Sequence, residues 1–376
     1  MDKSEKFITQ YHNWLAETDY FYKRFHLLAD ALEEFIINII SDTDSAKQVA
    51  SQFESVLSNC DEIDYESYDA TIAYSILHFL PRYHLFQLTF SKLFDKHILP
   101  NKKEPINSLD IGTGPSPVLY ALSDIYESLI EFGSIKKNLE YKPDYVEQSY
   151  AFRHFIHNFT EYLNYKYRSQ KEKWVVPYHH GTFNSFENIN FNLKTNDYEE
   201  YKKSLKLRYD IISSANFFTR LDQVKKQKYN IQHCIRNLKR NGIFVVWGAN
   251  AKNNYNKNKC YQTIYKQLKH IIEKCDYSTV RYKAKAKKCK LTRNLISFNY
   301  SDKFGGRIKQ FHKRIISMLI HLEALDAIGS ERTKKVILNC IKDNYNYTYK
   351  TEVHVFVKRT YPHSNGKFYQ RSSQRQ

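Results

Sequence analysis

The chain has 376 residues, of which 42% are hydrophobic, and it contains only 10 Gly, 8 Pro and 6 Cys. The hydrophobic content suffices for a folded core and excludes a wholly disordered protein. The scarcity of Gly, Pro and Cys excludes collagen-like and disulfide-dense secreted proteins.

The formal net charge of +18 is unevenly distributed along the chain. Residues 1–100 hold 8 basic and 16 acidic residues, whereas residues 251–376 hold 28 basic and 8 acidic residues. Such an asymmetry indicates a polyanionic partner, and we expect nucleic acid, in the first place RNA, to bind through basic residues 252–314. The alternative is a solvated basic face of a Lys-rich protein.

The N-terminal residues Met1–Lys6 are charged, and no apolar segment of signal-peptide length follows them. The sequence therefore predicts a cytoplasmic protein without a membrane partner. No two cysteines form a C-x-x-C pair, so no metal site is predicted, and Cys234 is expected to be a core thiol.

Residues 1–100 are predicted to form a helical N-terminal region, because aromatic and aliphatic residues recur every three or four positions. Pro81 interrupts this pattern and is expected to mark a helix start. We interpret the region as a helical cap that buries apolar surface of its neighbour.

Residues 101–360 alternate between strand and helix patterns. The predicted strands are Ile106–Ile111, Asp144–Glu147, Trp174–Tyr178, Tyr209–Ser213, Ile243–Trp247 and Tyr349–Lys358. The predicted helices include Val118–Phe132, Tyr150–Tyr167, Lys228–Leu238 and Ile308–Ile328. This order predicts an α/β fold with a doubly wound, mostly parallel sheet and helices on both faces. A basic insertion is expected at about 251–330 and a disordered tail at 361–376.

The most informative segment is Ser108–Pro117, a strand followed by a Gly-rich turn and a helix. Gly112 and Gly114 are expected to let the backbone approach a ligand at the carboxyl edge of the sheet. Pro117 occupies the place of the third glycine of a dinucleotide-binding turn. Asp110 would repel a pyrophosphate and suit a ligand that carries positive charge.

This segment resembles motif I of the class I S-adenosylmethionine-dependent methyltransferases, an apolar strand ending in Asp/Glu-x-Gly-x-Gly. The resemblance extends over about residues 105–250. It implies S-adenosylmethionine as the cofactor, with Asp110, Gly112, Thr113 and Gly114 in its site. Glu147 matches the acid that the family places on the ribose hydroxyls.

Two further segments fit the resemblance. Leu207–Phe218 is similar to the fourth strand and its active-site loop, which implies that Ser213 and Ser214 contact the cofactor and that Asn216 acts on the acceptor. Phe217 or Phe218 is expected to stack on a base or to pack in the core. Leu238–Trp247 is similar to the turn into the fifth strand.

The sequence departs from the family pattern at two places. Asp110 and Glu147 are 37 residues apart, which implies an insertion around Gly133–Lys142. The third-strand segment, which holds the expected cofactor contacts Thr182 and Phe183, has no acid for the adenine amine.

The expected function is therefore methyl transfer from S-adenosylmethionine, with RNA or another nucleic acid as the acceptor. Two alternatives stay open: a methyltransferase of a small molecule or protein, and a catalytically inactive methyltransferase-like protein that binds nucleic acid.

Overall fold

The structure is a computed structural model, and it describes residues 3–58, 66–101, 105–133, 140–170, 174, 209–248, 261–273, 289–342 and 348–358. The predicted strand Trp174–Tyr178, apart from Trp174, and the tail 361–376 lie outside these residues.

The N-terminal region is helical, as predicted. Its helices are α1 (Lys3–Thr18), α2 (Tyr20–Ile39), α3 (Thr43–Ser51), α4 (Phe53–Ser58) and α5 (Tyr68–Asp95). Asp42 caps α3 by accepting a hydrogen bond from the Ser45 amide, and Ser67 caps α5 by accepting one from Ala70. These caps explain where the two helices begin.

The prediction that Pro81 starts a helix is wrong, because α5 continues through it. A proline inside a helix removes one backbone hydrogen bond. Here Pro81 is itself buried, and α5 has buried residues along its whole length. Burial of that surface outweighs the loss of one hydrogen bond, since tertiary packing supplies most of a helix's stability.

The central sheet has the strand order β2-β1-β3-β4-β6-β5. Its strands are β1 (Ile106–Ile111), β2 (Tyr141–Val146), β3 (Tyr209–Ala215), β4 (Leu238–Gly248), β5 (Cys289–Asn299) and β6 (Thr348–Lys358). The first four are parallel, and β6 is antiparallel to both β4 and β5. The predicted mostly parallel α/β sheet is confirmed, although the sequence reading missed β5.

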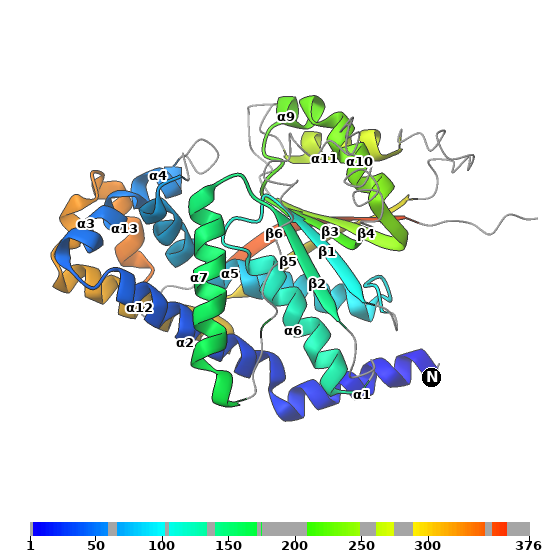
Figure 1. Cartoon of the computed structure of the whole chain (residues 1–376), viewed down its shortest axis with the longest axis horizontal. Helices are drawn as coiled ribbons and strands as arrows, with labels where there is room; N and C mark the ends of the chain where they lie inside the picture. The colour runs from blue at the N-terminus through cyan, green and yellow to red at the C-terminus, as the bar shows by residue number, and fades with distance from the viewer. Residues whose placement is uncertain are drawn as a thin grey trace, which may run out of the picture.

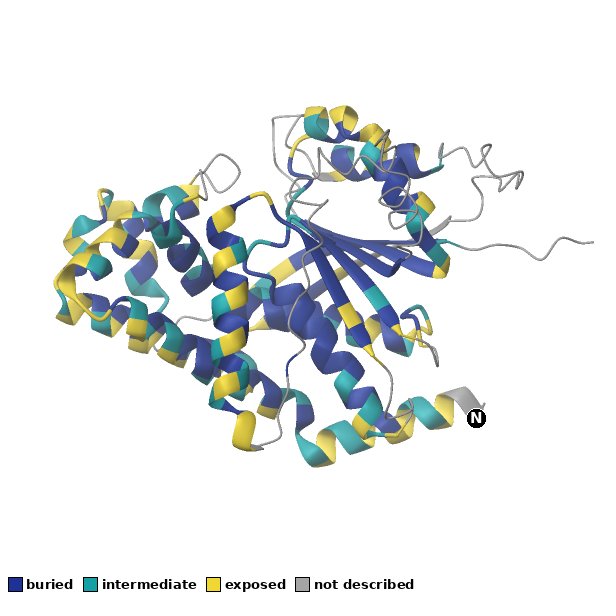
Figure 2. Cartoon of the chain, in the orientation of Figure 1, coloured by how far each residue is buried: buried dark blue, intermediate teal, exposed yellow. Residues whose placement is uncertain are grey.

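Helices cover both faces of this sheet (Figure 1). The helices within and after the parallel part are α6 (Pro117–Glu131), α7 (Tyr150–Lys166), α9 (Leu221–Lys226), α10 (Lys228–Asn237) and α11 (Tyr261–Glu273), with a short 3-10 helix at Arg168–Gln170. One face packs against α5 and α6 and the other against α9, α10 and α11, so the strands are buried along most of their length (Figure 2).

Alternate residues of β4 enter different cores. Ile243, Val245 and Trp247 belong to the cluster shared with α5 and α6, whereas Phe244 and Val246 belong to the cluster shared with α10 and α11. Successive side chains of a strand point to opposite faces, which explains this division. Val353, Val355 and Val357 of β6 lie together in the first cluster, as their spacing predicted.

The C-terminal helices are α12 (Lys303–His321) and α13 (Glu331–Asn339), with a 3-10 helix at Ala324–Ala327 between them. The helix predicted to reach Ile328 thus ends early, because Glu323 adopts a left-handed backbone with φ of 52°. No helix in the described ranges is long and apolar enough to cross a bilayer. The division into regions 1–100, 101–360 and 361–376 stays a prediction.

Candidate functional site

The Gly-rich turn joins β1 to α6 at the carboxyl edge of the parallel strands. Gly112 and Gly114 have φ values of 65° and 55°, a backbone conformation that disfavours residues with a side chain. The Gly112 amide donates a hydrogen bond of 2.8 Å to the Val146 carbonyl, which ties the turn to the end of β2. The site predicted from the sequence therefore lies where parallel sheets bind ligands.

Gly112 is required by the protein's own packing. A Cβ at this position would lie 2.4 Å from Cδ2 of Phe217, in the loop after β3. The expectation that Gly112 leaves space for a ligand is corrected in this respect, because an aromatic ring fills that side of the turn. At Gly114 a Cβ would have ordinary contacts, so only its positive φ requires glycine there.

Asp110 is buried beneath the turn, with 1% of its surface exposed. The Ser213 hydroxyl donates a hydrogen bond of 2.6 Å to its Oδ1. Burial raises the pKa of Asp110 to about 7, against the smaller opposing effect of this hydrogen bond. The predicted residues Asp110 and Ser213 are thus brought together.

Glu147 follows β2 and bonds directly to the turn. Its Oε2 accepts a hydrogen bond of 2.8 Å from the Gly114 amide, and its Oε1 accepts one of 2.9 Å from the Ser149 amide. Burial raises the pKa of Glu147 to about 7, although both backbone hydrogen bonds act in the opposite direction. Glu147 is therefore part of the same site as Asp110, although the two acids are 37 positions apart in the sequence.

Three other predicted residues, Ser214, Thr113 and Asn216, lie near the turn. The Ser214 hydroxyl is fully buried and donates to the Ile111 carbonyl at 3.3 Å, so it links β3 to β1. Thr113 is also buried, directly after β1. Asn216 follows β3 in a left-handed conformation with φ of 54°, held by a hydrogen bond from its backbone amide to the Trp247 carbonyl.

Some of the residues singled out in the sequence lie away from the turn, and others lie outside the described ranges. Phe218 is 2% exposed and packs in the core, whereas Phe217 is half-buried against Gly112. Cys234 is fully buried, as predicted, and burial raises the pKa of its thiol. Thr182 and Phe183 lie outside the described residues.

The sequence reading missed the aromatic side chains that α5 and α7 bring to the turn. A Cβ at Gly114 would lie 3.9 Å from Cε1 of Tyr74 and 4.0 Å from Cζ of Phe152. These two rings meet edge to face, with their centroids 5.4 Å apart. Helical periodicity places each ring within a helix, but no local signal indicates that α5 and α7 both reach the turn.

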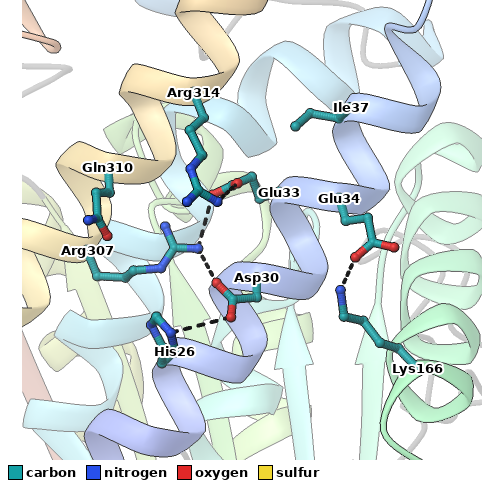
Figure 3. A pocket seen from close by; sticks show the side chains of 9 residues that line it. All are labelled: His26, Asp30, Glu33, Glu34, Ile37, Lys166, Arg307, Gln310 and Arg314. Atoms are coloured by element: carbon teal, nitrogen blue, oxygen red, sulfur yellow. Dashed lines mark hydrogen bonds and ion pairs between the residues drawn. The ribbon is translucent and has the colours of Figure 1, made fainter.

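A second polar region lies between α2, α7 and α12, around a hollow of about 430 Å³ (Figure 3). Nη2 of Arg307 lies 2.5 Å from Oδ1 of Asp30 and 3.0 Å from Oε2 of Glu33. Nη1 of Arg314 lies 2.6 Å from Oε1 of Glu33. Basic residues of the predicted nucleic-acid surface therefore pair with acids of the N-terminal region, which accounts for part of the charge asymmetry.

Comparison with known proteins gives only distant structural likeness. No family model matches the chain, and no curated protein matches it. The chain is similar to precorrin-6y C5,15-methyltransferase from Geobacter metallireducens, with 10% identity and a TM-score of 0.34 over 74% of this chain and 88% of that one.

Two further solved structures are similar to the same extent. Magnesium protoporphyrin IX methyltransferase from Synechocystis, solved with bound S-adenosylmethionine, has 8% identity and a TM-score of 0.34 over 81% of this chain and 94% of that one. Coclaurine N-methyltransferase has 10% identity and a TM-score of 0.35 over 88% of this chain and 99% of that one. Likeness at this level assigns no function, so the function rests on the residues of this chain.

Proposed function

We propose that the protein is an S-adenosylmethionine-dependent methyltransferase. The observation that carries this proposal is the hydrogen bond of 2.8 Å from the Gly114 amide to the Glu147 carboxylate. In a phosphate-binding turn this amide would face the ligand's phosphate. Here a protein carboxylate occupies that place, with the buried Asp110 beside it. Two acids at the turn disfavour a pyrophosphate and favour a ligand with positive charge.

The residues of the turn fit a sulfonium nucleoside. Glu147 would hold the ribose, because each oxygen of a carboxylate has a second lone pair to accept a hydroxyl proton. Gly112, Thr113 and Gly114 would bind through their backbone. The carboxylate of Asp110 would stabilise the positive charge of the donor. Ser213 and Ser214 would hold β3 against β1 through their hydroxyls, with only their backbone left to contact the donor.

When bound, S-adenosylmethionine supplies a methyl group already activated by its sulfonium. The protein must then orient a nucleophile in line with that carbon and exclude water. Within the described ranges the side-chain amide of Asn216 makes no hydrogen bond, so it can bind an acceptor at the end of β3. A general base is needed only if the acceptor atom is protonated and weak.

Calorimetric titration with S-adenosylmethionine and S-adenosylhomocysteine tests the proposal. We expect saturable binding of both by the full chain. Transfer of labelled methyl groups to cellular RNA, protein and small-molecule fractions then identifies the acceptor class. Absence of binding by the wild-type protein would contradict the methyltransferase proposal. Binding without methyl transfer would indicate a catalytically inactive methyltransferase-like protein.

Nucleic acid remains the acceptor proposed from the charge of residues 251–376. Lys303, Arg307 and Arg314 pair within the protein and contribute less to this surface than the sequence suggested. The Lys-rich segments 252–260 and 274–288 lie outside the described residues. A salt titration of RNA binding is decisive, because contacts to phosphates weaken steeply with salt. No binding at low salt would favour a small-molecule or protein acceptor.

A further inference from the structure

The first half of α5 meets the turn after β1 through Tyr74. Tyr74, His78 and Arg82 are spaced four residues apart, so they follow one another along the helix surface. The ring centroids of Tyr74 and His78 are 4.9 Å apart, and the Arg82 guanidinium carbon lies 4.9 Å from the Tyr74 centroid. The three side chains therefore form one cluster, which we call the α5 cluster.

Two contacts show how α5 lies against the sheet. Tyr74 contacts the turn after β1, since a Cβ at Gly114 would lie 3.9 Å from its ring. Phe86 packs on Trp247 near the end of β4, with the ring centroids 4.8 Å apart. The Arg82 guanidinium lies over the Tyr74 ring, which places it next to the turn after β1.

Arg82 is half-buried and makes no ion pair with a carboxylate of the described residues. Its Nε is buried without a hydrogen-bond partner there. A guanidinium is always charged, and a buried donor without a partner is costly. Arg307 differs in its charge compensation, because two carboxylates hold its Nη2, although its Nε and Nη1 also lack a hydrogen-bond partner among the described residues.

The two buried histidines near this cluster carry no charge of their own near neutral pH. Burial lowers the pKa of His78 to about 4 and that of His312, on α12, to about 4. Both rings are therefore uncharged near neutral pH. His312 contacts the α5 backbone through Nε2, 2.9 Å from the Ile76 carbonyl.

We propose that Arg82 binds a carboxylate or phosphate group of a molecule held at this turn, with Tyr74 beneath the guanidinium. The inference deepens the proposed methyltransferase function and rests on it. Two sources supply such an anion: the carboxylate of the donor's amino-acid part, and an anionic group on the acceptor. The planar guanidinium fork suits both, since it binds either group in a bidentate manner.

The test compares wild type with Arg82→Gln. Calorimetry measures affinity for S-adenosylhomocysteine and for 5′-methylthioadenosine, which lacks the amino-acid part. Thermal unfolding is measured in sodium phosphate and in sodium chloride of equal ionic strength. The matched control is Lys92→Gln, which removes an exposed charge from the last turn of the same helix.

If the donor is the source, Arg82→Gln weakens S-adenosylhomocysteine binding about tenfold or more and leaves 5′-methylthioadenosine unchanged. If the acceptor is the source, both nucleosides bind as before, but the stabilisation by phosphate is lost. Arg82→Lys keeps the positive charge and should retain part of the nucleoside affinity or of the stabilisation by phosphate. This variant separates loss of anion binding from misfolding.

The proposal is overturned if Arg82→Gln matches wild type in nucleoside affinity and in its response to phosphate. If wild type binds neither nucleoside but is stabilised by phosphate through Arg82, the methyltransferase function fails while the anion site stands. Lys92→Gln should resemble wild type in every measurement.

Discussion

The interface between α2 and α12 and the turn after β1 both bury carboxylates, and they neutralise them differently. On α2, Glu33 is enclosed by Arg307 and Arg314, and Asp30 also pairs with Arg307. At the turn after β1, Asp110 is held by the Ser213 hydroxyl, and Glu147 is held by two backbone amides. Burial raises the pKa of each of these two acids to about 7.

This difference separates a structural interface from a candidate ligand site. Carboxylates matched by arginines are complete within the protein, because each charge has an opposite charge beside it. Buried carboxylates held by neutral donors remain poorly compensated, and a cationic ligand would improve their surroundings.

The largest expected effect is at the paired region. Arg307→Met removes the buried partner of Glu33 and of Asp30 and leaves Glu33 with the exposed Arg314, so it should lower the free energy of unfolding by about 3–5 kcal/mol. Urea denaturation measures this loss. Arg314→Gln is the control, because that side chain is 64% exposed and should cost less than about 1 kcal/mol. Equal effects of the two variants would contradict the assigned difference in burial.

The next effect concerns the packing of the turn. Gly112→Ala places a methyl group against Phe217 and strains a residue with φ of 65°, so we expect a loss of about 2–4 kcal/mol. In a Phe217→Ala background the clash disappears, and the same substitution should cost only about 1–2 kcal/mol. Thermal unfolding of wild type, the two single variants and the double variant gives the coupling energy between residues 112 and 217. Strict additivity of the two substitutions would argue against the contact.

Asp110→Asn tests whether the turn recognises positive charge. It should weaken binding of S-adenosylmethionine by about 2 kcal/mol, and it should weaken binding of S-adenosylhomocysteine less, because that product lacks the sulfonium. Calorimetry with both ligands measures the difference. An equal loss for both would mean that Asp110 supports the turn without sensing the donor's charge.

The last prediction concerns the pH dependence of stability and of donor binding. Since burial raises the pKa of Asp110 and Glu147 to about 7, both acids stabilise the fold below about pH 4 and lose this contribution as pH rises towards 7. Donor affinity should move the other way, rising by up to about tenfold per pH unit below pH 7 as one carboxyl ionises. Affinity that falls over this range would contradict the role of the ionised acids.

Much of the fold was predictable because its signals are local. The strand, turn and helix at Ser108–Pro117 follow from residues adjacent in the chain, and the buried valines of β6 follow from their alternation. The strand β5 was missed because Lys and Arg residues around it resemble a solvated loop. The continuous helix through Pro81 was missed because local propensity does not include the burial that stabilises it.

The sequence alone determined that Asp110, Gly112 and Gly114 share one turn, since they are covalent neighbours after an apolar strand. Only the tertiary structure decided that Phe217 fills the space beside Gly112 and that Glu147 bonds to Gly114. It also decided that α12 meets the acids of α2. The physical reason is that charge and size are encoded residue by residue, whereas the partner of each group depends on which distant elements come into contact.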